Sequence, residues 1–207
     1  MKGNLIIISS PSGGGKGTLI REVLGTVPHL GYSVSLTTRP PRHGEVNGKD
    51  YHFVSRAEFE TYKEKGRFLE SAEVHGNFYG TSLEQIEKMT DTGMDVILEI
   101  DVQGAASVLE KMPEAVSIFI LPPSFEVLRA RLTARATEEV NDLDLRLSNA
   151  LDEVMQYSSF AYSVINDEIA AASNKIASII LAERQRPRRQ SEVIQGILNS
   201  FERAKRL

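Results

Sequence analysis

The pattern of apolar positions along the chain predicts four buried β-strands. Short apolar runs occur at residues 5–8, 96–100, 117–121 and 163–165, and each is rich in Val, Ile or Leu. Segments with apolar residues at helical spacing separate these runs. Strands that alternate with helices are typical of a parallel sheet covered by helices, so we expect an α/β fold.

Helix start and stop signals divide the N-terminal half of the chain. The first helix is expected from about residue 15 to residue 24, with Gly25 as its stop. Two more helices should begin near residues 56 and 83 and end at Gly66 and Gly93. Each follows a serine with the spacing of a capping box, in the pairs Ser55–Glu58 and Ser82–Gln85.

The C-terminal half predicts a lid and an amphipathic last helix. Ser124 should cap a helix over residues 125–133, and its charged continuation makes residues 125–146 a candidate lid. Strong helical patterns cover residues 143–155 and 169–183. After Pro187, a last helix should pack on the parent core or on a second subunit, and both alternatives stay open. Its apolar face carries Val193, Ile194, Ile197, Leu198 and Phe201.

The segment between Gly31 and Gly80 differs in character from the rest of the chain. Short extended segments alternate there with Gly and Pro, which predicts a small β-rich subdomain. We therefore expect residues 1–31 and 82–207 to form the core and residues 32–81 to form an inserted subdomain.

Composition and charge narrow the range of functions. The 207 residues are 41% hydrophobic, enough for one compact domain with small inserts. The chain has no cysteine, which excludes disulfides and zinc–thiolate sites, and its four histidines lack metal-ligand spacing. A net charge of −4 argues against general binding to nucleic acid or anionic membranes. The apolar stretch near the N-terminus is too short for a signal peptide or a membrane span, so we expect a cytoplasmic protein.

A glycine-rich segment between the first strand and the first helix has the pattern of a phosphate-binding loop. Glycines let successive N–H groups face an anion, the helix adds its positive end, and Lys16 adds a mobile charge. Such a cluster can also be an ordinary tight turn, but the preceding apolar run and the lysine favour a nucleotide polyphosphate site. The candidate ATP-binding residues here are Ser10, Pro11, Ser12, Gly13, Gly14, Gly15, Lys16, Gly17 and Thr18.

This loop departs from the full consensus at two positions. Ser10 stands where the first glycine is expected, and Gly17 follows the lysine, so the hydroxyl of Thr18 comes one place late. Ligation of magnesium by Thr18 is therefore left open. Further along, Arg39 and Arg42 flank two prolines that stiffen the backbone, a geometry suited to gripping a second phosphate.

Six sequence strings, in order, resemble the guanylate kinase family. The resemblance runs from the glycine-rich loop to Asp167 and so covers nearly the whole chain. It implies a P-loop NTPase parallel sheet flanked by helices, with a small mixed α/β GMP-binding insert and a helical lid. The strings are Ser35-Leu36-Thr37-Thr38-Arg39, the segment from Arg42-His43-Gly44-Glu45 to Asp50-Tyr51, Phe68-Leu69-Glu70, Gly76-Asn77-Phe78-Tyr79-Gly80-Thr81, Ile100-Asp101-Val102-Gln103-Gly104 and Leu121-Pro122-Pro123-Ser124.

The resemblance implies two groups of GMP-binding residues. Arg39, Arg42, Tyr51 and Tyr79 would hold the phosphate, because a phosphate dianion prefers charge-assisted donors. A second group, Ser35, Glu70, Thr81 and Asp101, would read the guanine, whose N1–H and N2 amino group are donors that a carboxylate accepts. Taken singly, the two tyrosines could be ordinary β-rich core and Glu70 could be a surface strand charge.

The resemblance also implies the charges that assist phosphoryl transfer, which are Lys16, Arg39, Arg131, Arg135 and Arg146. Asn166 matches an adenine-side contact, with a plain turn as the alternative. Magnesium would arrive with ATP, and Thr18 and Asp101 are possible ligands, mainly through water. Glu99 and Asp101 lie at the carboxyl end of a strand, where α/β proteins place ligands. The family's lid pattern is broken at Ala136, where a glycine is usual.

These implications predict an enzyme that transfers the γ-phosphoryl group of ATP to GMP, giving ADP and GDP. The expected partners are ATP and GMP, with a homo-oligomer through the last helix as a further possibility. One alternative is a guanylate-kinase-like binding module that has lost catalysis, although such modules typically have a degraded phosphate loop. A second alternative is a related enzyme that acts on another phosphorylated acceptor.

Overall fold

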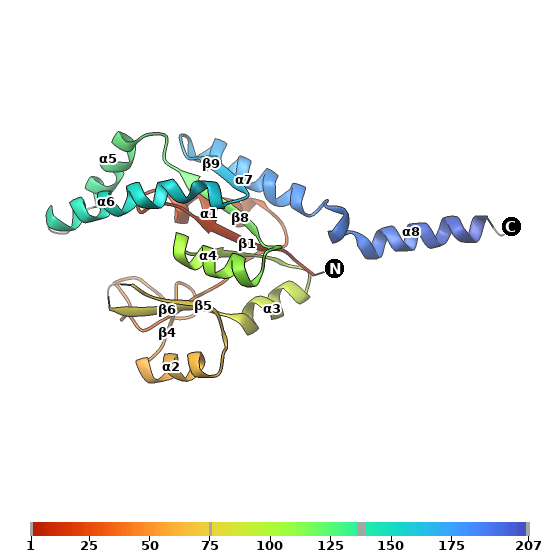
Figure 1. Cartoon of the computed structure of the whole chain (residues 1–207), viewed down its shortest axis with the longest axis horizontal. Coiled ribbons are helices and arrows are strands. Elements are labelled where there is room, and N and C mark those ends of the chain that lie inside the picture. The colour runs from red at the N-terminus through yellow and green to blue at the C-terminus, as the bar shows by residue number, and fades with distance from the viewer. Residues whose placement is uncertain (1, 75, 136–139, 206–207) are drawn as a thin grey trace.

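The core of the molecule is a parallel sheet of five strands. The computed structural model describes residues 2–74, 76–135 and 140–205, with the side chains of residues 135 and 140–145 excepted. The strand order is β2-β7-β1-β8-β9, and every neighbouring pair is parallel. This arrangement confirms the predicted α/β fold (Figure 1). The strands are β1 (Leu5–Ser9), β2 (Leu30–Tyr32), β7 (Asp95–Glu99), β8 (Val116–Leu121) and β9 (Tyr162–Ile165).

Helices cover both faces of this sheet because its strands are apolar on both sides. Ile6 and Ile8 of β1 pack in one buried cluster with residues of α1 (Lys16–Thr26) and α7 (Ile169–Glu183). Leu5 and Ile7, the alternate positions, pack on the other face with residues of α3 (Leu83–Asp91) and α4 (Val102–Lys111). Each fully buried Ile or Leu contributes about 1.5–3 kcal/mol of transfer free energy. The packed sheet therefore sets the positions from which the loops at the ends of its strands begin.

Three local predictions were wrong or incomplete. Gly25 lies inside α1 and does not stop it; the helix runs to Thr26, shortly before Pro28. Ser82 caps α3 by accepting the Gln85 N–H at 3.3 Å, but the reciprocal half of the box is missing, since the Gln85 side-chain oxygen is buried without a partner among the described residues. The strand β2 was not predicted, because its three residues, Leu-Gly-Tyr, are too few to give a pattern.

The inserted segment forms a second sheet with the order β4-β3-β6-β5. Its strands are β3 (Leu36–Thr37), β4 (His52–Phe53), β5 (Phe68–Val74) and β6 (Asn77–Ser82). The expected boundary at residues 31/32 falls inside β2, so Tyr32 belongs to the core sheet and the second sheet begins at Leu36. Helix α2 (Arg56–Glu64) starts with the complete Ser55–Glu58 capping box. It buries Phe59, whose ring centroid lies 4.5 Å from that of Phe68.

The segment expected to be a lid contains two helices. Helix α5 (Phe125–Arg135) starts after Ser124, whose hydroxyl accepts the Val127 N–H, and α6 (Val140–Met155) follows; residues 136–139, and with them the Ala136 departure, lie outside the described residues. Leu128 and Leu132 are buried together with Ala150. This cluster packs the two helices against each other.

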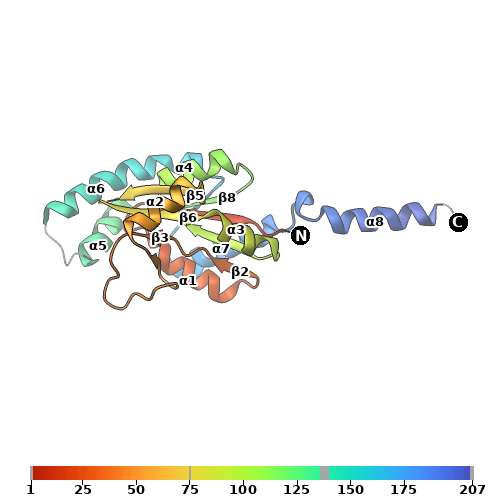
Figure 2. The same ribbon diagram turned by 90° about the horizontal axis from the view of Figure 1, so that it is seen from below.

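The chain ends in a helix that leaves the body of the molecule. Two 3₁₀ turns, Gln156–Ser159 and Pro187–Arg189, flank β9 and α7, and α8 (Ser191–Ala204) then extends away from the core in both ribbon views (Figures 1 and 2). No helix in the described parts of the chain is long and apolar enough to cross a membrane.

Candidate nucleotide-binding site

The glycine-rich loop connects the carboxyl end of β1 to the N-terminus of α1, as predicted. Gly13 and Gly15 have positive φ angles of 81° and 90°, which L side chains rarely adopt. Space is also limiting, since a Cβ on Gly15 would lie 2.3 Å from Asn166 Nδ2 and one on Gly13 would lie 2.9 Å from Leu132. Lys16 is the first residue of α1, and its Nζ donates to the carbonyl of Ile100 at 3.3 Å. The lysine therefore reaches from the start of α1, which follows β1, to the end of the neighbouring strand β7.

Two residues from the far end of the chain support the loop. The Asn166 amide donates to the Gly14 carbonyl at 2.8 Å, and the Asn166 carbonyl accepts from Arg131 Nη2 at 3.0 Å. Arg131 Nη1 is buried and has no hydrogen-bond partner among the described residues. Asn166 is 3% exposed, and its amide nitrogen braces the loop, while its Oδ1 has no hydrogen-bond partner among the described residues.

A cavity of about 280 Å³ lies between the glycine-rich loop and the inserted sheet. It brings together residues from the core and the insert that are far apart in sequence. The lining includes six predicted site residues along with several others: Lys16, Tyr32, Ser35, Tyr51, Glu70, Ala72, Val74, Tyr79, Glu99, Ile100 and Asp101.

Two carboxylates converge on one wall of this cavity. Glu70 on β5 is buried, and its Oε1 accepts the hydroxyl of Thr81 at 2.6 Å. Burial raises the pKa of Glu70, and the nearby Asp101 raises it further, while the Thr81 hydrogen bond and Lys111 act in the opposite direction. Asp101 is the N-cap of α4 and accepts the Gly104 N–H at 2.8 Å.

Gly104 lies beside both carboxylates. A Cβ at this position would lie 3.4 Å from Asp101 Oδ1 and 3.5 Å from Glu70 Oε2. Both acids therefore lie near the same point beside the N-terminus of α4. The result is a set of hydrogen-bond acceptors suited to a ligand edge that carries only donors.

Three residues of the expected phosphate grip, Arg39, Tyr51 and Tyr79, lie close together on the insert. Arg39 lies 5.4 Å from the ring centroid of Tyr51, and the rings of Tyr51 and Tyr79 meet edge to face at 5.9 Å. Burial raises the pKa of Tyr51, so its hydroxyl stays protonated and able to donate. Arg42 is exposed, and neither Arg39 nor Arg42 is among the residues that line the cavity.

The remaining predicted residues are placed less completely. Thr18 is half-buried on α1 and Arg146 is half-buried on α6. The side chain of Arg135 lies outside the described residues. Among the described residues, no three His, Cys, Asp or Glu side chains cluster in a way that could hold a metal ion by themselves. Any Mg²⁺ would need ligand phosphates and water as well, which is the usual mode for nucleotide-bound magnesium, and Asp101 lies in the same cavity as Lys16.

Sequence reasoning missed three polar contacts of the site. The Tyr32 hydroxyl donates to Glu99 at 3.2 Å inside the cavity, and burial together with Glu99 raises the Tyr32 pKa. Glu153 on α6 accepts the backbone N–H of Ser12 at 3.0 Å. Glu45 binds Arg39. Glu45 carried a signal because it stands within the motif that contains Arg42, and Glu99 carried one because it ends a strand. Nothing local marks Tyr32 or Glu153.

Comparisons with known proteins identify the family of this chain. The guanylate kinase family model matches residues 2–183. A guanylate kinase of Neisseria meningitidis is 50% identical over 199 residues, covering 96% of this chain and 97% of that protein. One from Geobacter metallireducens is 46% identical over 193 residues, covering 93% and 95%. The crystal structure of guanylate kinase from Anaplasma phagocytophilum has a TM-score of 0.74 and 36% identity, covering 89% of this chain and 88% of that one. The chain belongs to the guanylate kinase family.

Proposed function

We propose that this protein transfers the γ-phosphoryl group of ATP to GMP, giving ADP and GDP. The observation that carries the proposal is the shared cavity, which has Lys16 of the glycine-rich loop on one side and Glu70 of the insert on the other. Two nucleotides bound there would meet at their phosphates. Holding both reactants in line supplies a large part of the acceleration in phosphoryl transfer.

The ATP phosphates would be held by the loop from Ser10 to Thr18 and by the positive end of α1. The charges of Lys16, Arg39, Arg131, Arg135 and Arg146 would stabilise the transferring phosphoryl group. The buried, unpartnered Nη1 of Arg131 supports this role, because it is 3.9 Å from a Cβ built on Gly15 and so lies against the loop. Asp101 would hold Mg²⁺ mainly through water, with Thr18 as a second possible ligand, and the ion would neutralise charge on the β- and γ-phosphates.

The protein would recognise both the phosphate and the base of the acceptor, GMP. Arg39, Arg42, Tyr51 and Tyr79 would bind the GMP phosphate. Ser35, Glu70, Thr81 and Asp101 would bind the guanine, whose N1–H and N2 amino group face acceptors. The convergence of Glu70 and Asp101 beside Gly104 supports the choice of guanine. Adenine lacks that pair of donors and would leave the acids unpaired.

A coupled assay of ADP release with MgATP and GMP tests the proposal. Turnover that depends on both nucleotides supports the enzyme. GMP binding without turnover would favour the alternative of an inactive binding module, and turnover with a different phosphorylated acceptor would favour a related kinase. A cytoplasmic location fits a chain without cysteines, since disulfides would have no part in its stability.

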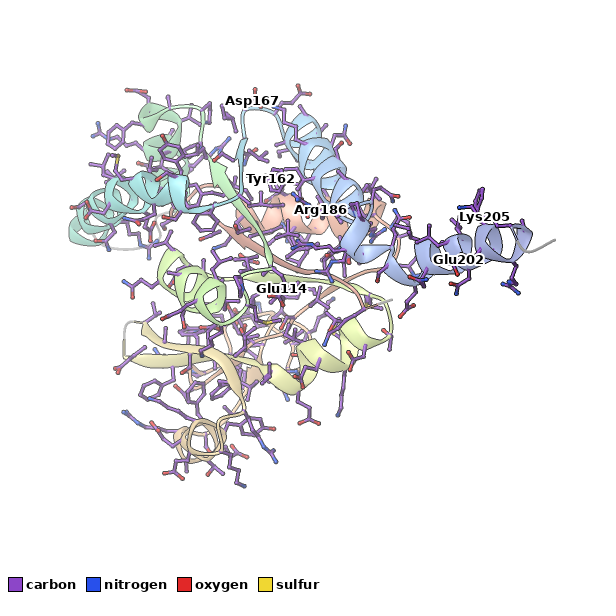
Figure 3. All side chains as sticks on the ribbon, turned by 45° about the vertical axis from the view of Figure 1, so that its right-hand side comes forward. Glu114, Tyr162, Asp167, Arg186, Glu202 and Lys205 are labelled. Atoms are coloured by element: carbon purple, nitrogen blue, oxygen red, sulfur yellow. The ribbon has the colours of Figure 1, made fainter. Side chains whose placement is uncertain are left out.

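We also propose that α8 mediates self-association. Val193, Ile197 and Phe201 are 50%, 50% and 66% exposed on one face of a helix that extends from the body. In Figure 3, Tyr162 and Arg186 lie together where the chain leaves the body, while Glu202 and Lys205 project from the outer part of α8. Isolated helices of this length are marginal in water, so a partner surface would stabilise it.

Light scattering compares the full chain with a variant that ends at Arg186. The full chain should have at least twice the monomer mass and the shortened chain the monomer mass. A monomeric full-length protein would contradict self-association without affecting the proposed activity. The double substitution Ile197→Asp, Phe201→Asp provides a version of the test that keeps the chain length.

A further inference from the structure

A single carboxylate, that of Glu45, fixes both arginines of the expected phosphate grip. Its two oxygens accept from Arg39 Nη2 at 2.8 and 2.9 Å, and Oε2 also accepts the backbone N–H of Arg42 at 2.7 Å. The Glu45 N–H in turn donates to the Arg42 carbonyl at 3.1 Å. The arginine side chain and the loop backbone are therefore tied to one anchor.

The Arg39 guanidinium is held on several sides without any ligand. Its Nη1 donates to the Pro40 carbonyl at 2.8 Å, while its plane lies over the Tyr51 and Phe53 rings at 5.4 and 5.9 Å. The Arg39 side chain is 12% exposed and that of Glu45 is 21% exposed. The hydrogen bond from Arg39 lowers the pKa of Glu45, so this carboxyl is ionised at neutral pH.

We propose that Glu45 is a positioning residue for the phosphate of the acceptor nucleotide, acting through Arg39 and Arg42. The inference rests on the proposed function, which places that phosphate at these arginines. The competing view treats the carboxylate as a stand-in for phosphate that must leave when GMP binds. The Arg42 contacts argue against it, because Glu45 closes the turn that carries Arg42 and cannot leave without opening that turn.

The two views predict opposite signs for removal of the charge. With Glu45 ionised, the two guanidiniums and the carboxylate sum to +1, and Glu45→Gln raises that sum to +2. If Glu45 were only a competitor, this variant would bind GMP more tightly. If Glu45 orients the grip, the variant binds GMP more weakly, because an amide nitrogen would face a guanidinium or an N–H in at least one of the three contacts.

The test measures GMP and guanosine side by side in the full-length protein. Calorimetric affinities for both ligands, and kcat and KM for GMP at saturating MgATP, are determined for wild type, Glu45→Gln and Glu45→Asp. Guanosine lacks the phosphate and so reports on the base site alone. Glu73→Gln is the matched control, because Glu73 is an exposed carboxylate of β5 in the same subdomain. Circular dichroism melts check that each variant folds.

The expected result for Glu45→Gln is a rise of about tenfold or more in the Kd and KM for GMP, with kcat within about threefold and guanosine affinity unchanged. The Kd and KM for GMP of Glu45→Asp should lie between those of Glu45→Gln and wild type. Glu45→Asp serves as the test variant if Glu45→Gln does not fold. Tighter or unchanged GMP binding overturns the proposal, as does a parallel loss of guanosine affinity, which would mean that Glu45 merely holds the subdomain together. Absence of GMP turnover in the wild type would instead refute the proposed function.

Discussion

The residues proposed to bind the guanine are placed where they oppose the stability of the fold. Glu70 is 6% exposed and is flanked by a second acid, Asp101, with Lys111 as a partial counter-charge. Burying a carboxylate is unfavourable unless the charge is paired or hydrogen-bonded. The arrangement makes sense if a ligand supplies the missing donors, which is what guanine would do.

Glu70→Gln should therefore lower activity selectively. The variant loses one acceptor and presents a donor to the guanine donors. We expect kcat/KM for GMP to fall by at least about tenfold, equivalent to about 1.4 kcal/mol, while the weak AMP activity falls much less or rises. Both acceptors are measured with saturating MgATP. Equal losses with GMP and AMP would show that Glu70 does not read the base.

The same variant should change how stability depends on pH. Folding raises the pKa of Glu70, so the folded protein binds that proton more tightly than the unfolded chain does. The stability from Glu70 is then fully present below the unfolded pKa and is lost as pH rises through the folded value. In ligand-free melts, Glu70→Gln should gain in Tm relative to wild type as pH rises from about 4.5 to 8. A Tm difference that is constant over this range would contradict the assigned pKa direction.

Lys16→Ala should act on catalysis with little effect on folding. Lys16 is half-buried at the start of α1, and its ammonium donates to the Ile100 carbonyl. Removal of a charge that stabilises the transition state typically lowers kcat by about two orders of magnitude. Lys88→Ala, an exposed lysine on α3, is the control and should keep wild-type turnover. A Lys16→Ala enzyme with more than half of wild-type kcat would refute the role of Lys16.

Sequence reasoning found those site residues that have a local or motif signal. Lys16 follows a glycine cluster, and Glu70 and Asp101 stand in strings with a defined order. The brace between Asn166 and Gly14 and the contact between Glu153 and Ser12 span 152 and 141 positions. No local pattern can reveal such contacts, because the fold alone brings those positions together.

At the level of helices and strands, apolar runs predicted four strands of the core sheet, including the short β9, but not β2. The strand β1 has five consecutive buried residues and was found, whereas β2 has three half-buried residues and was missed. Gly25 shows the limit of single-residue signals, because it lies within α1. The helix ends only after Thr26, where Val27 is extended and Pro28 cannot continue the helix. Propensity at one residue was overridden by the packing of Leu19, Ile20 and Val23.

One ion pair joins the start of β7 to the end of α7. Asp95 is 3% exposed in its side chain; it accepts from Arg184 Nε at 2.6 Å and from the backbone N–H of Asn4 at 2.6 Å. Arg184→Ala would leave this buried carboxylate without its counter-charge. The expected loss of unfolding free energy is about 3 kcal/mol, the low end for a broken buried pair because Arg184 is partly exposed.

Thermal melts check this prediction. The expected loss lowers Tm by roughly 6–12 °C for a domain of this size, while GMP turnover at 25 °C stays at the wild-type level. Lys175→Ala is the matched control, since its pair with Asp167 is exposed on both sides and 4.0 Å long. Equal Tm values for Arg184→Ala and Lys175→Ala would show that the Asp95 pair does not hold these elements together.

The whole molecule places two sheets around one cavity. The core side of the cavity carries Lys16 of the glycine-rich loop and the acids at the end of β7, and the insert contributes Tyr51, Tyr79 and Glu70. Helix α5 cannot move as a rigid lid without breaking packing, because Leu128 and Leu132 are buried beside Gly13 of the loop. Movement that closes the site would therefore have to come from the outer part of this segment or from the insert.

The most direct test of this account is an acceptor panel with MgATP, in which GMP, AMP, CMP, UMP and sugar phosphates are compared under one set of conditions. Two or three uncompensated buried groups, at about 1–3 kcal/mol each, account for a preference of roughly 10⁴-fold. The account predicts that GMP exceeds AMP in kcat/KM by about that factor and that the sugar phosphates are inactive. Comparable turnover with AMP, or better turnover with a non-nucleotide acceptor, would contradict it.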